Sequence, residues 1–182
     1  MATSTPEERL AALGLTFPAV PTPMANYVPY RLAGNLLFLS GQGPKLADGS
    51  FMVGRLGKDA SVDQGYEAAK LTGLQLLAVA KAALGELSRV EAVVKLLGMV
   101  NAEPDFGDHP KVINGCSDLM VEVLGEAGRH ARSAVGMGSL PNRIMVEIEA
   151  ILQIKAEGQA RRSSISGRID EAAGRGETGE RP

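Results

Sequence analysis

Two short apolar stretches late in the chain constrain the fold more than any other feature. Ser133 to Met137 and Ile144 to Ile154 are both suited to β-strands, and within the second stretch apolar residues alternate with Glu147 and Glu149. Strict alternation is typical of a strand with one buried and one solvated face. We therefore expect two neighbouring strands in one sheet, with both glutamates pointing to the same face.

The same region carries side chains that could form a site for a small acidic molecule. Arg132 precedes the first stretch, and arginine holds a carboxylate or phosphate through two parallel hydrogen bonds. Glu147 is a candidate for moving a proton or holding a water molecule. The alternative is that these are ordinary polar positions on a half-solvated sheet, a pattern that is common in antiparallel sheets.

Length and composition limit the classes of protein to which the chain can belong. Its 182 residues, 45% apolar and 22% charged, suit one domain with a hydrophobic core. No apolar stretch approaches the roughly 18 residues of a membrane span, and the first residues do not resemble a secretory signal. The net charge of −2, the scattered basic residues and the lack of Trp give no basis for nucleic-acid binding. The single cysteine, Cys116, fits a reducing, cytoplasmic location.

Local signals predict an alternating order of helices and strands. Thr5 with Glu8, and Ser61 with Gln64, have the spacing of helix-capping boxes, and Gly34-Asn35 is a turn signal. The predicted order is helix, three strands, helix, strand, helix and two strands, which indicates an α+β fold with a mixed sheet and helices packed on one face. Besides the two stretches above, the predicted strands are 28–32, 36–40, 51–56 and 90–100, and the two longer helices are 61–84 and 108–124.

The composition also predicts three segments along the chain. Residues 1–26 form an N-terminal helix and a proline-rich lead, and residues 27–156 form the folded domain. From position 157 to 182 the chain loses its apolar periodicity, which favours a disordered tail. The other interpretation of this tail is an interaction arm.

Several motifs that often carry chemistry are incomplete here. Gly41-Gln42-Gly43-Pro44 is not followed by a helix or by a Gly-Lys-Ser/Thr sequence, which argues against a phosphate loop. His109 and His130 have no cysteine or acidic partner at ligand spacing, so no metal site is expected. Cys116 falls in the apolar pattern of a helix and is expected in the core, and Ser40 lacks the glycine context of a hydrolase nucleophile.

Three blocks of the sequence resemble the RidA/YjgF family of reactive-intermediate deaminases. They are Asn35-Leu-Leu-Phe-Leu-Ser-Gly-Gln42, the strand that begins at Arg132, and Val146-Glu-Ile-Glu-Ala-Ile151, and their order and spacing match across residues 27 to 154. The resemblance implies a chorismate mutase-like fold and a homotrimer with sites between subunits. It also implies hydrolysis of reactive 2-enamine and 2-imine intermediates to 2-oxo acids and ammonia, without a metal or organic cofactor.

The resemblance assigns roles to five positions. Arg132 and Glu147 are the expected catalytic residues, with Arg132 also holding the substrate carboxylate, and Tyr27, Ser40 and Asn114 are expected to bind substrate. The chain departs from the family pattern at Ala134, where a small thiol is frequent, and at the Arg129-His130 pair. Three alternatives remain at this point: a non-catalytic trimer that binds 2-oxo acids, a ribonuclease or translation inhibitor, and a chorismate mutase-like enzyme.

Overall fold

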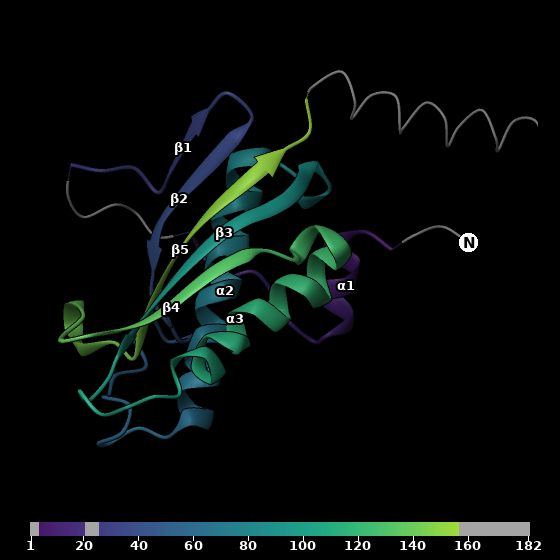
Figure 1. Cartoon of the computed structure of the whole chain (residues 1–182). Helices are drawn as coiled ribbons and strands as arrows, with labels where there is room; N and C mark the ends of the chain where they lie inside the picture. Colours follow the sequence, from purple (N-terminus) through teal and green to yellow (C-terminus); the bar gives the residue numbers. More distant parts are fainter. Residues whose placement is uncertain (1–3, 21–25, 157–182) are drawn as a thin grey trace, which may run out of the picture.

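The computed structural model describes residues 4–20 and 26–156, which form one five-stranded sheet and three α-helices (Figure 1). The predicted tail, and Pro21 and Pro23 of the proline-rich lead, lie outside these residues. The strands are arranged in the order β1-β2-β5-β3-β4. In chain order the elements are α1 (Pro6–Ala12), β1 (Tyr30–Ala33), β2 (Leu36–Gln42), α2 (Val62–Leu84), β3 (Val90–Asn101), α3 (His109–Leu124), β4 (Ala131–Met137) and β5 (Val146–Ile154).

Both predicted capping boxes are present. The Thr5 hydroxyl accepts the Glu8 backbone N–H at 3.2 Å, and Glu8 accepts the Thr5 N–H at 2.7 Å. Ser61 and Gln64 form the same reciprocal pair at the start of α2, with distances of 3.2 and 2.9 Å. Each box satisfies two N–H groups that have no partner inside the helix. The starts of α1 and α2 are therefore determined by local sequence, as predicted.

The sheet confirms the predicted mixed architecture but corrects two details. The stretch 51–56 is not a strand. It forms only isolated pairings, with Lys45, Ala60, Ala102 and Ile144, because Gly54, at φ 150°, interrupts the extended backbone. The expectation that β4 and β5 are neighbours is also wrong. Strand β3 lies between them, parallel to β4 and antiparallel to β5, since the chain from Met137 to Val146 crosses the end of β3.

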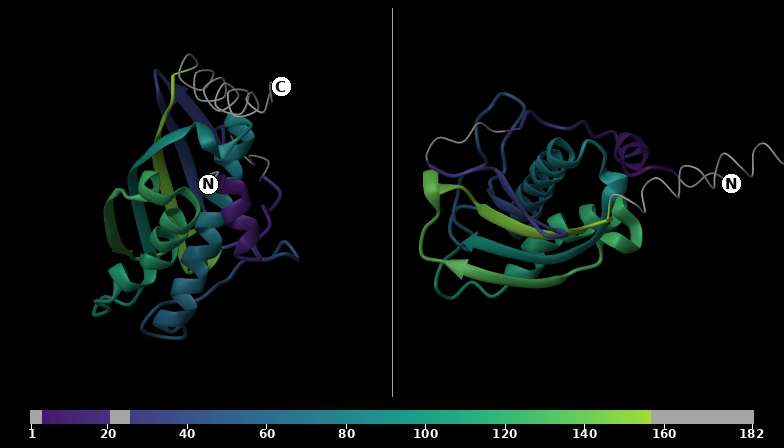
Figure 2. Two further views of the ribbon diagram at one scale, coloured as in Figure 1. Left: turned by 90° about the vertical axis from the view of Figure 1, so that its right-hand side faces the viewer. Right: turned by 90° about the horizontal axis from the view of Figure 1, so that it is seen from above.

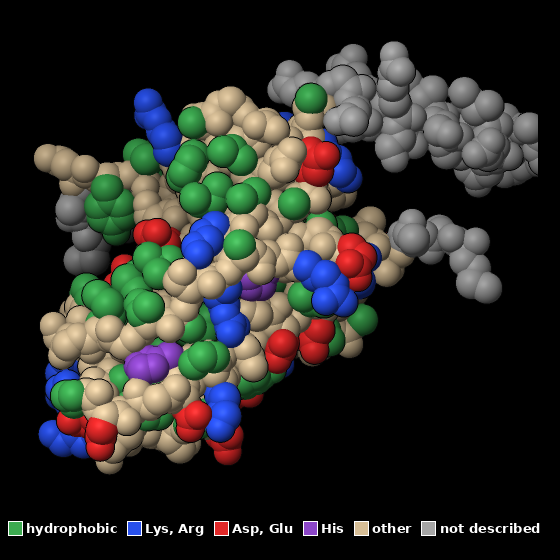
Figure 3. All heavy atoms as spheres, in the orientation of Figure 1, with side chains coloured by type: hydrophobic (Ala, Val, Ile, Leu, Met, Phe, Trp, Pro, Cys, Tyr) green, Lys and Arg blue, Asp and Glu red, His purple; other side chains and the backbone are tan. Residues whose placement is uncertain are grey.

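Helices α2 and α3 cover one face of the sheet, and the other face is open (Figure 2). Along β5, alternate side chains from Val146 to Ile154 are buried beneath the helices. Glu147 and Glu149 both point to the open face, as the alternation predicts. This face also carries partly exposed apolar side chains such as Phe38 on β2 and Val135 on β4, and apolar side chains gather over the strands in Figure 3.

The two long helices approach each other closely at Gly115 of α3. A Cβ atom at this position would collide with the backbone carbonyl of Tyr66 on α2, which cannot swing away as a flexible side chain would. We expect Gly115→Ala to lower the free energy of unfolding by about 1–3 kcal/mol, measured by urea denaturation. The matched control is Gly107→Ala, where a Cβ atom meets open space. Equal stabilities of the two variants would show that α2 and α3 are not in close contact at this point.

Candidate functional site

Glu147 projects into a cavity of about 380 Å³ at the end of strand β2. The register of β2 against β5 shifts between Leu39 and Gln42, and this irregularity brings Gly41 next to the glutamate. A side chain at position 41 would collide with the Glu147 carboxylate, so a glycine is needed there. The other residues that line the cavity are Tyr27, Pro29, Gln42, Gly43, Lys45, Gly49, Phe51, Gln75, Pro141, Asn142 and Ile144.

The environment of Glu147 makes its carboxylate a stronger base than an exposed one. Partial burial raises the pKa of Glu147, and the neighbouring Glu149 carboxylate raises it further. Both effects disfavour the charged form of Glu147, and a higher pKa increases its affinity for a proton. A half-buried carboxylate that lines a cavity can therefore accept a proton from a bound molecule.

The structure gives Tyr27 and Ser40 different surroundings. Tyr27 lines the Glu147 cavity and is 55% exposed. Ser40 is not among the residues lining this cavity; its hydroxyl donates a hydrogen bond to the Val28 carbonyl at 2.7 Å. Ser40 thus fastens the segment that carries Tyr27 to the end of β2. Its predicted role in binding substrate stays a prediction.

Arg132 is held by helix α3 on the other side of the sheet. Its Nη1 donates to Asn114 Oδ1 and to Ser117 Oγ, both at 2.9 Å, and its Nη2 faces the Pro110 carbonyl at 3.4 Å. The structure therefore joins Arg132 and Asn114, two of the predicted site residues. These contacts fix the guanidinium group before any ligand arrives, which lowers the entropic cost of binding an anion.

A histidine and a serine that the sequence did not single out as site residues support this arginine. His130 Nδ1 lies 2.6 Å from the Gly128 carbonyl, and its Nε2 lies 3.0 Å from Ser117 Oγ. A carbonyl can only accept, so Nδ1 carries the proton and Nε2 accepts the Ser117 hydroxyl. Ser117 Oγ in turn accepts from Arg132. Two sequence signals were available: Ser117 is one turn after Asn114, and His130 is two residues before Arg132.

The Arg132 cluster and the Glu147 cavity lie on opposite faces of the sheet within one chain. Arg132 is opposite Leu96 on β3, and Glu147 is opposite Met99 on the same strand. Side chains alternate along a strand, so positions 96 and 99 point to opposite faces. Leu96 is fully buried beneath the helices, whereas Met99 belongs to the open face. Arg132 and Asn114 thus form one group and Glu147 and Tyr27 another, while Ser40 lies outside both.

The other features that the sequence raised do not add to the candidate site. Cys116 is fully buried, as predicted, and burial raises the pKa of its thiol to about 12. Within residues 4–20 and 26–156, no group of three His, Cys, Asp or Glu side chains is placed to hold a metal ion. None of the helices in these two ranges is both long and apolar enough to cross a membrane.

Comparison with known proteins identifies the family. Residues 7–152 match the family described as "YjgF/chorismate mutase-like, putative endoribonuclease", and the chain belongs to this family. Protein TCP17 of Trypanosoma cruzi is 44% identical over 146 residues, which cover 80% of this chain and 91% of that protein. This match confirms the family and the chorismate mutase-like fold that the three sequence blocks implied.

Two solved structures show how the fold is shared. The protein Atu1372 from Agrobacterium tumefaciens, of unknown function, is 47% identical, with a TM-score of 0.77 over 83% of this chain and 94% of that one. RidA from an Antarctic Psychrobacter is 27% identical, with a TM-score of 0.53 over 74% of this chain and 94% of that one. The chain is thus similar both to a structure without an assigned activity and to a RidA protein.

The state of His130 predicts a pH dependence of stability. Burial has the largest effect and lowers the pKa of His130; the hydrogen bond to the Gly128 carbonyl opposes it, and the nearby Arg132 adds a smaller lowering. Between the folded and unfolded pKa values the unfolded chain binds more protons. The contribution of His130 is therefore complete above its unfolded pKa of about 6.5 and is lost as the pH falls through the lower folded value.

We expect the free energy of unfolding to fall less between about pH 7.5 and about pH 5 in His130→Gln than in the parent protein. Urea denaturation at both pH values measures this difference, and an NMR titration of the imidazole gives the folded pKa directly. Equal pH dependence in the two proteins would show that His130 is not held in its neutral form.

Proposed function

We propose that this protein hydrolyses 2-imine and 2-enamine intermediates of amino-acid metabolism to 2-oxo acids and ammonia. The observation that carries the proposal is the half-buried Glu147 carboxylate in a cavity, together with an Arg132 guanidinium that is already fixed in position. An imine of a 2-amino acid offers a carboxylate for the arginine and an electrophilic carbon for water. Membership of the YjgF family and the likeness to a RidA protein support the choice of reaction.

The reaction needs one water molecule and proton transfers but no redox step. Water attacks the carbon of the C=N bond while Glu147 accepts one of its protons. The nitrogen takes up protons, the C–N bond breaks, and ammonia leaves as the carbon becomes the carbonyl of the 2-oxo acid. Arg132 orients the reacting carbon by holding the carboxylate through two hydrogen bonds. Imines hydrolyse readily in water, so the required lowering of the barrier is modest.

A complete site requires a second copy of the chain, because Arg132 and Glu147 point to opposite faces of one sheet. We infer a homotrimer in which the Arg132 cluster of one subunit faces the Glu147 cavity of the next. The open face of the sheet, with Phe38 39% exposed and Val135 41% exposed, offers apolar surface for such contacts. No cofactor or metal ion enters the proposed reaction, and a reducing cytoplasmic location remains the expectation for a chain with one cysteine.

Two other functions are separated from hydrolysis by experiment. A trimer that only binds 2-oxo acids would need Arg132 but no base at position 147. The family description also names an endoribonuclease, yet the described residues lining the Glu147 cavity include no histidine and only one cation, Lys45. Because the family description names this activity, RNA should be tested as a second substrate in the same assay.

Glu147→Gln separates catalysis from binding. The amide keeps the size of the side chain but cannot accept the proton, so 2-oxo acid release should fall by about 10²-fold or more. A pyridoxal-phosphate-dependent dehydratase generates the imine in the assay, and calorimetric titration with a 2-oxo acid should show retained binding. Glu149→Gln, on the same face of the same strand, is the matched control and should remain within a few-fold of the parent. Full activity of Glu147→Gln would show that Glu147 is not the base, and release of 2-oxo acid no faster with the parent protein than without it would leave binding alone.

Mixing two inactive variants tests whether the site is shared between subunits. Arg132→Lys loses the two-pronged contact with the carboxylate and Glu147→Gln loses the base, so each homotrimer should be nearly inactive. When the two are unfolded and refolded together in equal amounts, about one quarter of the sites should combine an intact Arg132 with an intact Glu147. We expect about that fraction of parent activity. No recovery, with mixed trimers shown by mass spectrometry, would place both residues of a site on one chain.

A further inference from the structure

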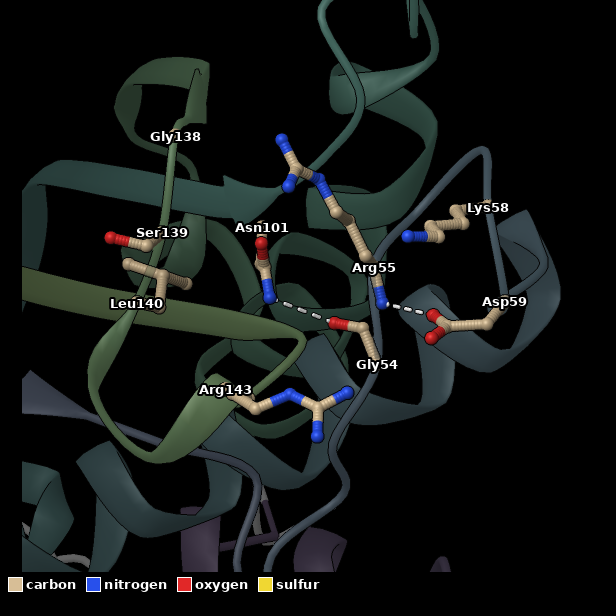
Figure 4. A pocket seen from close by; sticks show the side chains of 9 residues that line it. All are labelled: Gly54, Arg55, Lys58, Asp59, Asn101, Gly138, Ser139, Leu140 and Arg143. Atoms are coloured by element: carbon tan, nitrogen blue, oxygen red, sulfur yellow. Dashed lines mark hydrogen bonds between the residues drawn. The ribbon is translucent and has the colours of Figure 1, made fainter.

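A second cavity lies on the other side of the turn that connects β4 and β5. Its volume is about 220 Å³, smaller than the roughly 300 Å³ at which pockets for drug-sized ligands begin. Figure 4 shows Arg55, Lys58 and Asp59 on one side, Gly138 to Leu140 on the other, and Arg143 below. Asn101, at the end of β3, lies between the two walls.

The charges that line this cavity are unbalanced. Arg55 Nε pairs with Glu103 at 3.0 Å, and the Asp59 carboxylate accepts the backbone N–H of Arg55. The Lys58 and Arg143 side chains form no hydrogen bond or ion pair with any other residue in the described ranges. The lining thus carries three cations, Arg55, Lys58 and Arg143, against one carboxylate, Asp59, and the cavity keeps a net positive charge after Arg55 has paired with Glu103. Such an arrangement attracts an anion, because the cations otherwise repel each other.

Backbone hydrogen bonds hold the walls of the cavity in place. The Asn101 side chain, 6% exposed, donates from Nδ2 to the Gly54 carbonyl at 2.9 Å. The Gly54 N–H donates to the Arg143 carbonyl at 3.1 Å, and the Leu56 N–H donates to the Asn101 carbonyl at 2.8 Å. These bonds join three separate segments of the chain. A ligand would therefore enter a preformed site and would not have to order it.

The backbone at Arg143 is unusual in a way that supports a role in binding. Asn142 and Arg143 have φ values of 54° and 58°, in the left-handed region that residues other than glycine seldom adopt. Such a conformation costs free energy, and strain of this kind gathers at binding sites. In this conformation Arg143 lines the second cavity, while Asn142 lines the Glu147 cavity.

We propose that the second cavity binds a small dianion, either a phosphate monoester or a dicarboxylate, between Lys58 and Arg143. Lys58 and Arg143 can each face one negative charge of such a dianion, while the Asp59 carboxylate, which also lines the cavity, accepts the backbone N–H of Arg55. Arginine suits phosphate and carboxylate groups because its planar fork donates two parallel hydrogen bonds to either. The site is separate from the Glu147 cavity and does not depend on the reaction proposed for it.

Calorimetric titration of the full-length protein at low ionic strength tests this site with three probes: inorganic phosphate, succinate and acetate. We expect saturable binding of phosphate or succinate, one per chain, and much weaker binding of the monoanion acetate. Tighter binding of phosphate would identify the ligand class as phosphate monoesters, and tighter binding of succinate would identify it as dicarboxylates. The Lys58→Gln/Arg143→Gln double variant should bind that dianion at least about ten-fold more weakly.

Matched variants make the result decisive. Lys70→Gln/Arg129→Gln removes the same charge outside both cavities and should retain dianion binding, as should Arg132→Gln, which removes the guanidinium of the other candidate anion site. If the double variant at the cavity does not fold, as judged by circular dichroism, Lys58→Gln alone provides the test, since within the described residues the Lys58 side chain forms no hydrogen bond or ion pair. Absence of saturable binding, binding unchanged by the loss of Lys58, or equal losses in the charge-matched control would overturn the proposal. Loss of binding in Arg132→Gln would instead place the anion at the Arg132 cluster and would also overturn the proposal.

Discussion

The burial of one face of strand β5 beneath the helices determines the direction of every functional side chain on that strand. Val146, Ile148 and Leu152 are at most 2% exposed, and the core forms around them. Because side chains alternate along a strand, this burial places Glu147 on the opposite face. A slip of one residue in register would bury the glutamate and expose the core, so the position of the acid is fixed by the hydrophobic effect. The space for the Glu147 carboxylate then depends on one further local feature, the register irregularity in β2 that places Gly41 beside it.

Helix α3 plays the corresponding part for the arginine. The side of α3 that faces the core covers the sheet with buried residues such as Ile113 and Cys116, and Asn114 and Ser117 of the same helix hold Arg132. The packing that stabilises the domain thus also fixes the guanidinium group, and His130 completes the support from the start of β4. Each half of the candidate site is rigid within the chain. Under the proposed function, assembly of subunits brings two finished surfaces together and does not reshape them.

Features of the sequence that act over a few residues could be predicted, and features that depend on distant contacts could not. The capping boxes, the turn at Gly34 and the shared face of Glu147 and Glu149 follow from spacing alone, because each is decided by neighbours in the chain. The separation of β4 from β5 by β3 is a matter of strand order, which no local pattern contains. The roles of Arg132 and Glu147 came from the family resemblance, since an arginine and a glutamate on two strands are common. The contact of Ser117 with His130 spans 13 residues and two elements, and no fixed spacing announces it.

The turn between β4 and β5 connects the two cavities physically. Pro141, Asn142 and Ile144 line the Glu147 cavity, whereas Leu140 and Arg143 line the second one. The turn is held by hydrogen bonds from the Arg143 N–H to the Leu140 carbonyl and from the Gly54 N–H to the Arg143 carbonyl. Its two left-handed residues leave little freedom to move one wall without the other. The two cavities therefore share one wall, and any change in the backbone at Asn142 or Arg143 alters the lining of both.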